Sequence, residues 1–443
     1  MRVLLIADAG DGLLDLALRA QASGHQVRFF CRRYDARTRP IGRGLVDRIA
    51  DWHDAMPWAD LVILEGNGCY MHEMDAWRKH GKLIIGGNKE SAEWELDRAA
   101  GMKVFKQVGV PVPPYREFAD YAEAVVFVER RGEVFFSKPC SDTADKSLSA
   151  KTGVPEDPAY QLRKWEKKHW HPPCPFLLQE QIDGVEMGVG AWFGPAGFAE
   201  GWEENFEHKR FCSGDIGPNT GEMGTVLRYT KVSKLAGLVL KPFEDRLAAI
   251  KYCGNVDVNC IIDDAGAAWP LEWTMRLGWP SFNIETDLFD LDPIEFLGGL
   301  AAGEPPSSSH QLGKIAVGVI LGIPPYPAPP RDYDDILAIP IFGVDDDTHW
   351  HSSEVQSLAR IGEASIKSRP QTASKARTMT AGHYVGVAVG VGDTVRVAAR
   401  GAYKVLDKVS MPCSPFWRDD IGKRLQQELP RLQKHGFARG MTY

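Results

Sequence analysis

The sequence lacks any long hydrophobic run, and its cysteines are few and scattered. No uninterrupted apolar segment reaches the ~18 residues of a membrane span. Asp8 and Asp11 interrupt the apolar start of the chain, which argues against a signal peptide. None of the eight cysteines belongs to a CxxC pair or has the histidine spacing of a zinc site. We therefore expect a cytoplasmic protein with reduced thiols that does not contact a membrane.

An excess of positive charge is also missing. The net charge of the 443 residues is −7, so general nucleic-acid binding is not expected. Apolar residues make up 44% and charged residues 25% of the chain, as in ordinary globular proteins, and a chain of this length forms roughly two to four domains. The composition favours a multidomain protein, monomeric or homodimeric, whose partners are small molecules.

The first 90 residues alternate short apolar runs with a helical pattern. We expect a helix at residues 12–22 and strands at residues 3–6, 26–30, 61–64 and 82–85. This alternation predicts a parallel sheet that binds ligands at the carboxyl ends of its strands. The turn after the first strand, ADAGDG, is not a GxGxxG motif, and its two aspartates would repel a phosphate. We interpret it as a plain tight turn.

Two changes of composition divide the rest of the chain. The connector VPVPPY follows a helix expected at residues 91–109, and the stretch AAGEPPSSSH stands near residue 300. They predict domains of α/β and α+β type at residues 1–90, 91–300 and 301–443. Within the last two we expect a helix at residues 235–252, a final helix with Asp393 as its N-cap, and strands at residues 133–138, 175–181, 255–262, 268–274, 314–323, 337–342 and 383–391.

The stretch from Glu207 to Gly224, EHKRFCSGDIGPNTGEMG, fits neither a helix period nor a strand period. Its cations and bare backbone amides are suited to receive an anion such as phosphate. The alternative interpretation is an exposed loop of solvated charge, and composition alone leaves both open.

A second polar pattern lies on the hairpin expected at residues 255–274. Asp257 and Asn259 share one face of its first strand, and Glu272 and Thr274 share a face of the partner strand. Oxygen ligands spaced in this way suit a Mg²⁺ ion that bridges ATP phosphates. Lys138 ends an earlier strand, where it is placed to hold nucleotide phosphates. The alternatives are a solvated lysine and an edge-strand carboxylate that pairs with a lysine.

Several motifs together resemble one family of enzymes. GVPVPPY, QEQIDGVE, HKR followed by D-x-GPNTGxMG, LEWTMRLGWP, KIAVGVILGIPPYP and WRDDIGKRL occur in the order found in glycinamide ribonucleotide synthetases, the phosphoribosylamine–glycine ligases. This resemblance runs nearly end to end. It implies an ATP-grasp fold with an N-terminal Rossmann-like domain, two lobes that grip ATP and Mg²⁺ (or Mn²⁺), and a small C-terminal domain. A mobile lid is expected at about residues 115–185.

The resemblance also implies a reaction and the residues that carry it. A ligase of this family phosphorylates the carboxylate of an amino acid, such as glycine, and joins it to an amine, releasing ADP and phosphate. The implied metal ligands are Glu272, Thr274 and Asp257. The implied nucleotide-binding residues are Arg98, Lys138, Lys146, Gln179, Glu180, Ile182 and Glu186. The residues implied around the reacting acyl group and its acceptor are Lys209, Arg210, Asp215, Asn219, Thr220 and Arg276.

The chain departs from the family at three places. Where the family has EFNxRxGDPE, this chain has EWTMRLGWPS, so Thr274, Trp279 and Ser281 replace Asn, Asp and Glu. The phosphate loop GLAAGKGV becomes SDTADKSL, and the GGREH signature becomes AGDGL. We interpret the chain as a ligase that either carries out the reaction of this family itself or, as these changes favour, uses an altered amine acceptor. The alternatives are an inert nucleotide-binding homologue and a phosphoryl transferase that stops at the acylphosphate.

Overall fold

The structure is a computed structural model that describes residues 1–8, 12–32, 40–140, 156–169, 172, 174–304, 310–344, 349–358 and 377–443. The predicted site residue Lys146 and the turn residue Asp11 lie outside this part of the chain. None of the described helices is long and apolar enough to cross a membrane.

The N-terminal segment forms the parallel sheet that its sequence predicts. Its strands lie in the order β2-β1-β3-β4, and the bounds are β1 (Arg2–Ala7), β2 (Gln26–Cys31), β3 (Leu61–Leu64) and β4 (Leu83–Ile85). Helices α1 (Leu14–Ala22) and α2 (Met71–Lys79) connect them. Strand β3 is buried along its whole length, as expected where both faces of a parallel sheet are covered.

The helix predicted at residues 91–109 is wrong, because two helices occupy this segment. They are α3 (Lys89–Leu96) and α4 (Arg98–Gln107). Asp97 between them is extended, with φ −101° and ψ 102°, and its carboxylate accepts the backbone N–H groups of Ala99 and Ala100. Asp97 therefore ends one helix and caps the next. This break places Arg98 in the first turn of α4, at the site described below.

A small antiparallel sheet follows, in the order β5-β7-β6. Its strands are β5 (Tyr115–Phe118), β6 (Phe135–Pro139) and β7 (Phe176–Glu180), and α5 (Tyr121–Arg131) and α6 (Glu156–His169) belong to the same lobe. Phe118, Tyr121, Trp165 and Phe176 are buried together in a core of their own. A separate core makes this lobe a distinct packing unit within the fold.

The largest sheet is antiparallel and lies in the order β15-β14-β8-β10-β13-β16-β20-β17, with the short β9 (Gly197–Phe198) beside β8. Its strands are β8 (Val185–Gly194), β10 (Trp202–Glu207), β13 (Gly224–Thr230), β14 (Gly254–Ile262), β15 (Ala268–Thr274), β16 (Ile315–Gly322), β17 (Trp350–Ser352) and β20 (Tyr384–Gly392). The predicted hairpin of β14 and β15 is confirmed. Strand β16 pairs with β13, so the sheet runs across the predicted domain boundary at residue 301. The three domain ranges themselves stay a prediction.

The segments around this sheet differ from the sequence prediction in three places: one helix, one strand and one helix cap. The segment 235–252 is not one helix: Pro242 lies in a 3₁₀ turn (Lys241–Phe243) between α7 (Lys234–Val239) and α8 (Glu244–Ala249). No strand forms at residues 337–342, where isolated bridges follow a 3₁₀ turn (Tyr333–Ile336). The N-cap of α11 (Val395–Leu406) is Thr394 rather than Asp393, because the Thr394 side chain accepts the Val397 N–H.

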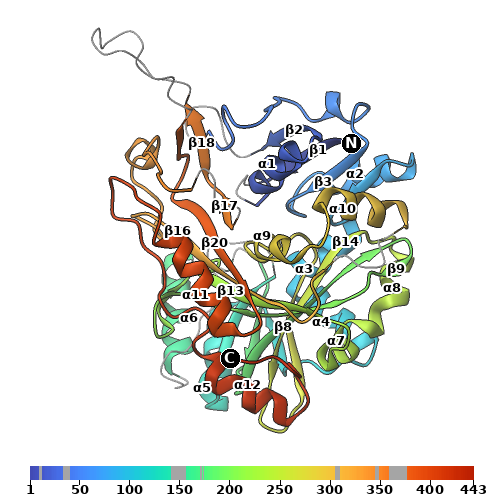
Figure 1. Cartoon of the computed structure of the whole chain (residues 1–443). Helices are drawn as coiled ribbons and strands as arrows, with labels where there is room; N and C mark the ends of the chain where they lie inside the picture. Colours follow the sequence, from blue (N-terminus) through green and yellow to red (C-terminus); the bar gives the residue numbers. More distant parts are fainter. Residues whose placement is uncertain are drawn as a thin grey trace, which may run out of the picture.

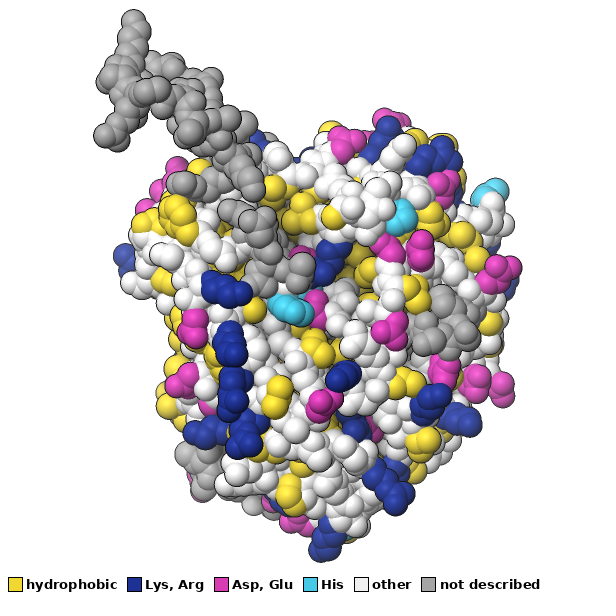
Figure 2. Space-filling view, viewed as in Figure 1, with side chains coloured by type: hydrophobic (Ala, Val, Ile, Leu, Met, Phe, Trp, Pro, Cys, Tyr) yellow, Lys and Arg dark blue, Asp and Glu magenta, His cyan; other side chains and the backbone are white. Residues whose placement is uncertain are grey.

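Two helices fill the space between the N-terminal sheet and the large sheet. Figure 1 shows α9 (Ser281–Glu285) and α10 (Pro293–Ala302) at this junction. A 3₁₀ turn, η3 (Thr286–Leu288), follows α9, and α12 (Leu425–Lys434) lies near the end of the chain. Figure 2 shows basic side chains in a row where α11 lies, and exposed Arg396, Arg400 and Lys404 recur there every four residues.

Candidate functional site

One face of the large sheet is polar, and its strand register explains why. In an antiparallel ladder, paired residues point to the same face, so Asp257 lies beside Thr274 and Asn259 beside Glu272. The neighbouring strands extend this polar face, whose members are Glu186, Glu203, Asn205, Glu207, Asp257, Asn259, Glu272 and Thr274. The alternate residues, such as Val189 and Val258, are fully buried in the core on the other face. The same alternation therefore builds the core and the candidate site.

Glycines in β8 let the polar side chains on both sides approach each other. A Cβ atom at Gly188 would lie 2.0 Å from Asn205 Oδ1 and 2.8 Å from Asn259 Oδ1. A Cβ at Gly190 would lie 3.1 Å from Asp257 Oδ2. The two glycines thus leave room for side chains from β10 and β14 above β8.

Lys209 lies where three carboxylates converge. Its Nζ is 2.9 Å from Glu207 Oε2, 3.2 Å from Glu186 Oε1 and 3.5 Å from Glu272 Oε1. Burial alone would lower the pKa of Lys209, but Glu186, Glu207 and Glu272 together hold this pKa well above its ordinary value. The site therefore concentrates negative charge around one cation.

Glu272 joins this group to two further cations. Arg98 Nη1 is 2.6 Å from Glu272 Oε2, and Arg98, followed by Lys209 and Lys138, holds the pKa of Glu272 far below its usual value. Lys138 donates from Nζ to the backbone oxygen of Leu271 over 3.2 Å. Burial lowers the pKa of Lys138 to about 8. Five predicted site residues thus meet from α4, β6, β8, β15 and the segment after β10.

Arg276 faces the N-terminal sheet. Its Nε donates to Glu95 Oε1 over 2.9 Å, and Glu95 Oε2 accepts the Met275 N–H and the Asn67 side-chain amide, each over 2.7 Å. The Glu95 carboxylate raises the pKa of Arg276. Sequence reasoning missed Glu95, because a single glutamate in a helix carries no signal of its partner far along the chain.

The predicted adenine-binding residues lie at the end of β7 in the small lobe. Gln179 is buried, and its side-chain amide lies 3.8 Å from Met102 Sδ. Glu180 Oε1 accepts from Arg131 over 3.0 Å. Ile182 is half-buried in the segment that connects β7 to β8. Their role in nucleotide binding stays a prediction.

The segment from Glu207 to Gly224 contains a short hairpin, so the prediction of a segment without strands is wrong. Strands β11 (Arg210–Cys212) and β12 (Ile216–Asn219) pair, with Arg210 opposite Asn219. Asp215 stands in the turn at φ 54°. Gly214 and Gly217 adopt positive φ and bend the backbone. Because the backbone bends here, the polar residues around the two glycines do not follow the two-residue period of a regular strand.

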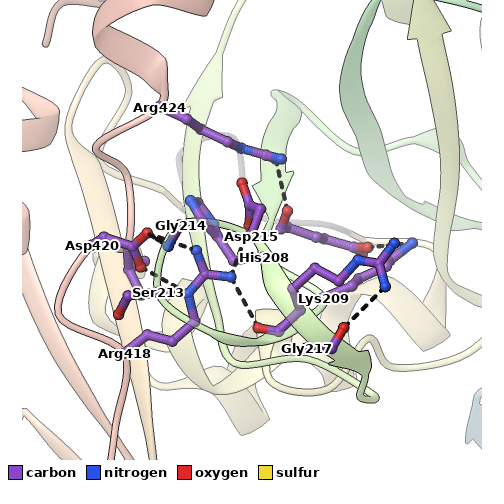
Figure 3. Close-up of polar contacts among 12 residues, drawn as sticks. His208, Lys209, Ser213, Gly214, Asp215, Gly217, Arg418, Asp420 and Arg424 are labelled. Atoms are coloured by element: carbon purple, nitrogen blue, oxygen red, sulfur yellow. Dashed lines mark hydrogen bonds and ion pairs between the residues drawn. The ribbon is translucent and has the colours of Figure 1, made fainter. Parts of the chain in front are cut away.

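A buried arginine near the C-terminus holds this hairpin (Figure 3). Arg418, 1% exposed, donates from Nη1 to the backbone oxygen of Arg210 and to Asp215 Oδ1 over 2.9 and 2.8 Å. Asp420 pairs with Arg418 and accepts the Gly214 N–H over 2.7 Å. Asp215, predicted to surround the acyl group, is therefore directed at Arg418 in this structure. Arg210 Nη1 donates to the Gly217 oxygen, and Asn219 is exposed.

The same C-terminal segment secures the residues just before the hairpin. His208 is buried, and its Nε2 accepts the Gly422 N–H over 3.1 Å. Burial holds the pKa of His208 well below its ordinary value, which agrees with a neutral, accepting ring. Arg424 donates to the backbone oxygen of Glu207 over 2.7 Å. The sequence motif WRDDIGKRL marks this segment but does not reveal these contacts.

The donor set around Glu272 fits a Mg²⁺ ion that arrives with a nucleotide. Mg²⁺ is usually held by one or two carboxylates together with phosphate oxygens and water. Glu272, Glu186 and Glu207 offer carboxylates that already converge on a positive charge. Within the described residues, no group of three or more His, Cys, Asp or Glu side chains is arranged to hold a metal by itself.

Asp257, the third predicted metal ligand, is directed away from this group. Its Oδ2 accepts from the Asn205 amide over 2.8 Å, and the same amide donates to Glu203 over 2.9 Å. Burial raises the pKa of Asp257 well above its ordinary value. Thr274 lies opposite Asp257 in the ladder. Metal binding by Asp257 and Thr274 therefore stays a prediction.

The chain is similar in sequence to known enzymes. No protein-family model matches the chain. The chain is 25% identical over 365 residues to a phosphoribosylamine–glycine ligase from Ralstonia nicotianae, covering 79% of this chain and 81% of that protein.

Solved structures give the fold. A phosphoribosylamine–glycine ligase from Thermotoga maritima matches with a TM-score of 0.71 at 18% identity, over 95% of this chain and 100% of that one. An N5-carboxyaminoimidazole ribonucleotide synthetase from the same organism matches with a TM-score of 0.58 at 13% identity, over 93% of this chain and 99% of that one. The fold is that of the ATP-grasp enzymes.

Proposed function

We propose that this chain is an ATP-dependent carboxylate–amine ligase. The premise is that it is an ATP-grasp enzyme of the kind that forms carbon–nitrogen bonds and that it is similar to phosphoribosylamine–glycine ligases. The carboxylate donor is glycine or another amino acid, and the amine acceptor differs from phosphoribosylamine. The observation that carries this proposal is the convergence of Arg98, Lys138, Glu186, Lys209 and Glu272 from five segments of the chain.

The chemistry follows from the charges in this group. A carboxylate is a poor electrophile, and a phosphoryl group transferred to it supplies a leaving group. ATP with Mg²⁺ would supply that phosphoryl group. Glu272 and Glu186 would hold the metal, while Lys138 and Arg98 would neutralise phosphate charge. Lys209 is positioned to stabilise negative charge as it builds on the transferred group. These residues act by position and charge rather than by proton transfer.

Contacts at the N-terminal sheet support an altered acceptor. The Glu65 carboxylate accepts the backbone N–H groups of Asp8 and Gly12, each over 2.7 Å, at the two ends of the first turn. Arg32 lies 2.7 Å from Asp8, so a carboxylate already engages this guanidinium. Amides and cations in such a turn are the groups that would bind a phosphate. At the described amides of Asp8 and Gly12 and at Arg32, carboxylates already occupy these groups, which disfavours an acceptor that presents a phosphate at this turn.

The experiment is a screen for ADP release with Mg²⁺ and ATP. Glycine and other amino acids are each combined with a panel of amines, and phosphoribosylamine is the reference acceptor. We expect release that requires both an amino acid and an amine, with phosphoribosylamine below the best amine. ATP binding without ADP release from any pair would support the inert homologue. A hydroxamate formed with hydroxylamine, in the absence of any amide product, would support the phosphoryl transferase.

A further inference from the structure

Beside the proposed reaction centre, the polar face of the sheet encloses a small cavity between β10, β14 and α9. It measures about 20 Å³, which is enough for one water-sized group. Its lining includes the carboxyl groups of Glu203, Glu207, Asp257 and Glu285 and the hydroxyl groups of Thr274 and Ser281. We call this space the acidic cavity.

Three of the four carboxyl groups of the acidic cavity are buried without a cation of their own, and the fourth, Glu207, pairs with Lys209. Glu203, Asp257 and Glu285 are 3%, 8% and 1% exposed. Among the ion pairs of the described chain, none includes any of these three side chains. Glu204, next in sequence and equally buried, instead pairs with Arg228 over 2.7 Å and accepts from Ser233. Glu203, Asp257 and Glu285 therefore differ from Glu204 in lacking a cation that would offset the cost of burying a negative charge.

The hydrogen-bond donors around the cavity are too few for its oxygens. The Asn205 amide serves both Glu203 and Asp257, and Tyr229 donates its single hydroxyl proton to Glu285 Oε2 over 2.5 Å. Glu285 Oε1 and Asn205 Oδ1 are buried in the described structure with no hydrogen bond of ordinary geometry, although the Glu203 carboxyl group and the Trp192 indole lie close to Glu285. Buried acceptors of this kind are normally satisfied, so these atoms point to a donor that enters from outside.

A primary ammonium group matches these requirements. It carries one positive charge and three N–H donors on an atom the size of a water molecule. A hydrated Mg²⁺ ion is a poorer match, because it keeps several water ligands and the cavity has room for one water-sized group. A water molecule carries no positive charge to pair with these carboxyl groups. We propose that the acidic cavity binds a primary ammonium group of one of the two substrates.

The position of the cavity connects it to the reaction. Glu207 lines the cavity, and its Oε2 also accepts from Asn259 over 3.0 Å and lies 2.9 Å from Lys209 Nζ. Ser281, which replaces an acidic residue of the similar family, begins α9 and lines the cavity, and Trp279, which replaces another, lies two residues before it. This inference rests on the proposed ligase function and names a substrate feature. The ammonium group belongs either to the amino-acid donor or to a diamine acceptor.

The test measures binding by calorimetry on the full chain, with Mg²⁺ and a non-hydrolysable ATP analogue. Glycine is compared with glycolate, which replaces the ammonium by a hydroxyl, and 1,4-diaminobutane is compared with 1-aminobutane. In one pair we expect the ammonium-bearing member to bind at least ~10-fold more tightly, as for a charge-assisted hydrogen bond. The pair that shows the preference identifies the donor or the acceptor as the source.

Variants then locate the preference. Glu285→Gln and Glu203→Gln should reduce the ratio of affinities to within about 3-fold of unity, because the charge on the cavity falls. Glu204→Gln is the matched control: it removes a buried carboxylate from the opposite face of β10 and should keep the ratio. Circular dichroism verifies that each variant is folded.

Two results would overturn the inference. One is equal affinity within both pairs on the wild-type protein, which needs no variant. The other is an ammonium preference that survives in folded Glu285→Gln and Glu203→Gln. ADP release is measured separately, so ammonium-selective binding without turnover would refute the ligase and leave the cavity assignment standing. Turnover without an ammonium preference would refute the cavity assignment and leave the ligase function standing.

Discussion

At the scale of single residues, the burial of Lys138 sets the pH range in which its side chain is charged. It lies in β6 with Arg98 and Lys209 nearby, and burial lowers its pKa to about 8. Below this pH the side chain is an ammonium ion that attracts phosphate, and above it the side chain becomes neutral. If Lys138 binds the phosphates of ATP as proposed, the lowered pKa places an upper pH limit on that interaction.

We expect the affinity for ATP to fall as pH rises from 7 to 9 in the wild-type protein. Lys138→Ala should weaken ATP binding about 10- to 100-fold at pH 7, the range of a lost charge-assisted hydrogen bond. Lys138→Arg keeps its charge at both pH values and should bind ATP with little pH dependence. Equilibrium dialysis with labelled ATP measures each affinity. A wild-type affinity that is constant across this range would contradict the assignment.

Glu272 is the residue on which metal-dependent turnover should depend most. Glu272→Gln removes its charge while it keeps the shape of the side chain, so we expect Mg²⁺-dependent ADP release to fall about 100-fold or more. Glu133→Gln, at an exposed carboxylate in the small lobe, serves as the control and should retain activity. Unchanged turnover in a folded Glu272→Gln protein would remove the metal role.

At the scale of elements, β8 requires glycine at position 188, where the side chains of Asn205 and Asn259 lie close to the strand. Gly188→Ala places a Cβ within 2.0 Å of Asn205 Oδ1, so we expect a loss of about 1–3 kcal/mol in the free energy of unfolding. Gly237→Ala in α7 meets no atom within 4 Å, and we expect it to stabilise the protein by about 0.5–1 kcal/mol. Urea unfolding compares the two, and equal effects would contradict the crowding at β8.

The β11–β12 hairpin depends on an arginine far away in sequence. Arg418→Gln breaks a buried ion pair with Asp215 and Asp420, so we expect a loss of about 3–5 kcal/mol in the free energy of unfolding. Arg431→Gln, which breaks an exposed pair with Asp264, should cost under about 1 kcal/mol. Protease cleavage within the hairpin should accelerate only in the first variant. Identical cleavage rates would show that Arg418 does not hold it.

At the scale of the whole molecule, a buried ionic group connects the N-terminal sheet to the large sheet. His351 in β17 is fully buried, with Nδ1 2.8 Å from Asp15 in α1 and Nε2 3.1 Å from Asp287 in η3. Burial opposes the charge on each group, but Asp15 and Asp287 raise the pKa of His351, and His351 lowers the pKa of both carboxyl groups. Arg19 lies beside both carboxylates.

This group should make stability depend on pH in both directions. The raised pKa of His351 contributes stability that is complete below about pH 6.5, the pKa of unfolded histidine, and is lost as pH rises through the folded value. The lowered carboxyl pKa values contribute stability that is present above about pH 4 and is lost as pH falls. We expect His351→Gln to be less stable by about 3–5 kcal/mol at pH 6 and to differ less at pH 9. Urea unfolding at both pH values measures the difference, and a gap independent of pH would contradict a charged His351.

The sequence predicts those parts of this molecule whose pattern is local. Alternation places the hairpin of β14 and β15 and the polar face that carries Asp257 and Glu272. Local patterns fail where one residue interrupts a helix, as Asp97 does between α3 and α4 and Pro242 does between α7 and α8. Both interruptions sit inside amphipathic stretches that otherwise read as continuous helices.

The part of the site that the sequence does not predict depends on distant partners. Glu95 meets Arg276 across 181 positions, and Arg418 meets Arg210 across 208. Neither pair has a periodic signal, because its geometry arises only when the sheets are assembled. Strand position and alternation point to Lys138 and Glu272, the resemblance to a known family implies a role for Lys209, and the structure adds that the three share one cluster.

The hydrogen bonds between β13 and β16 have a consequence for exchange between relatives. Consider a chimera that joins the first 300 residues of this chain to the last third of another ligase. Its two parts would meet between two paired strands of one sheet and not at a hinge between domains. Its two parts would have to agree in register at every rung from Gly224 to Arg228. The polar face of the large sheet and the C-terminal third should therefore be inherited together.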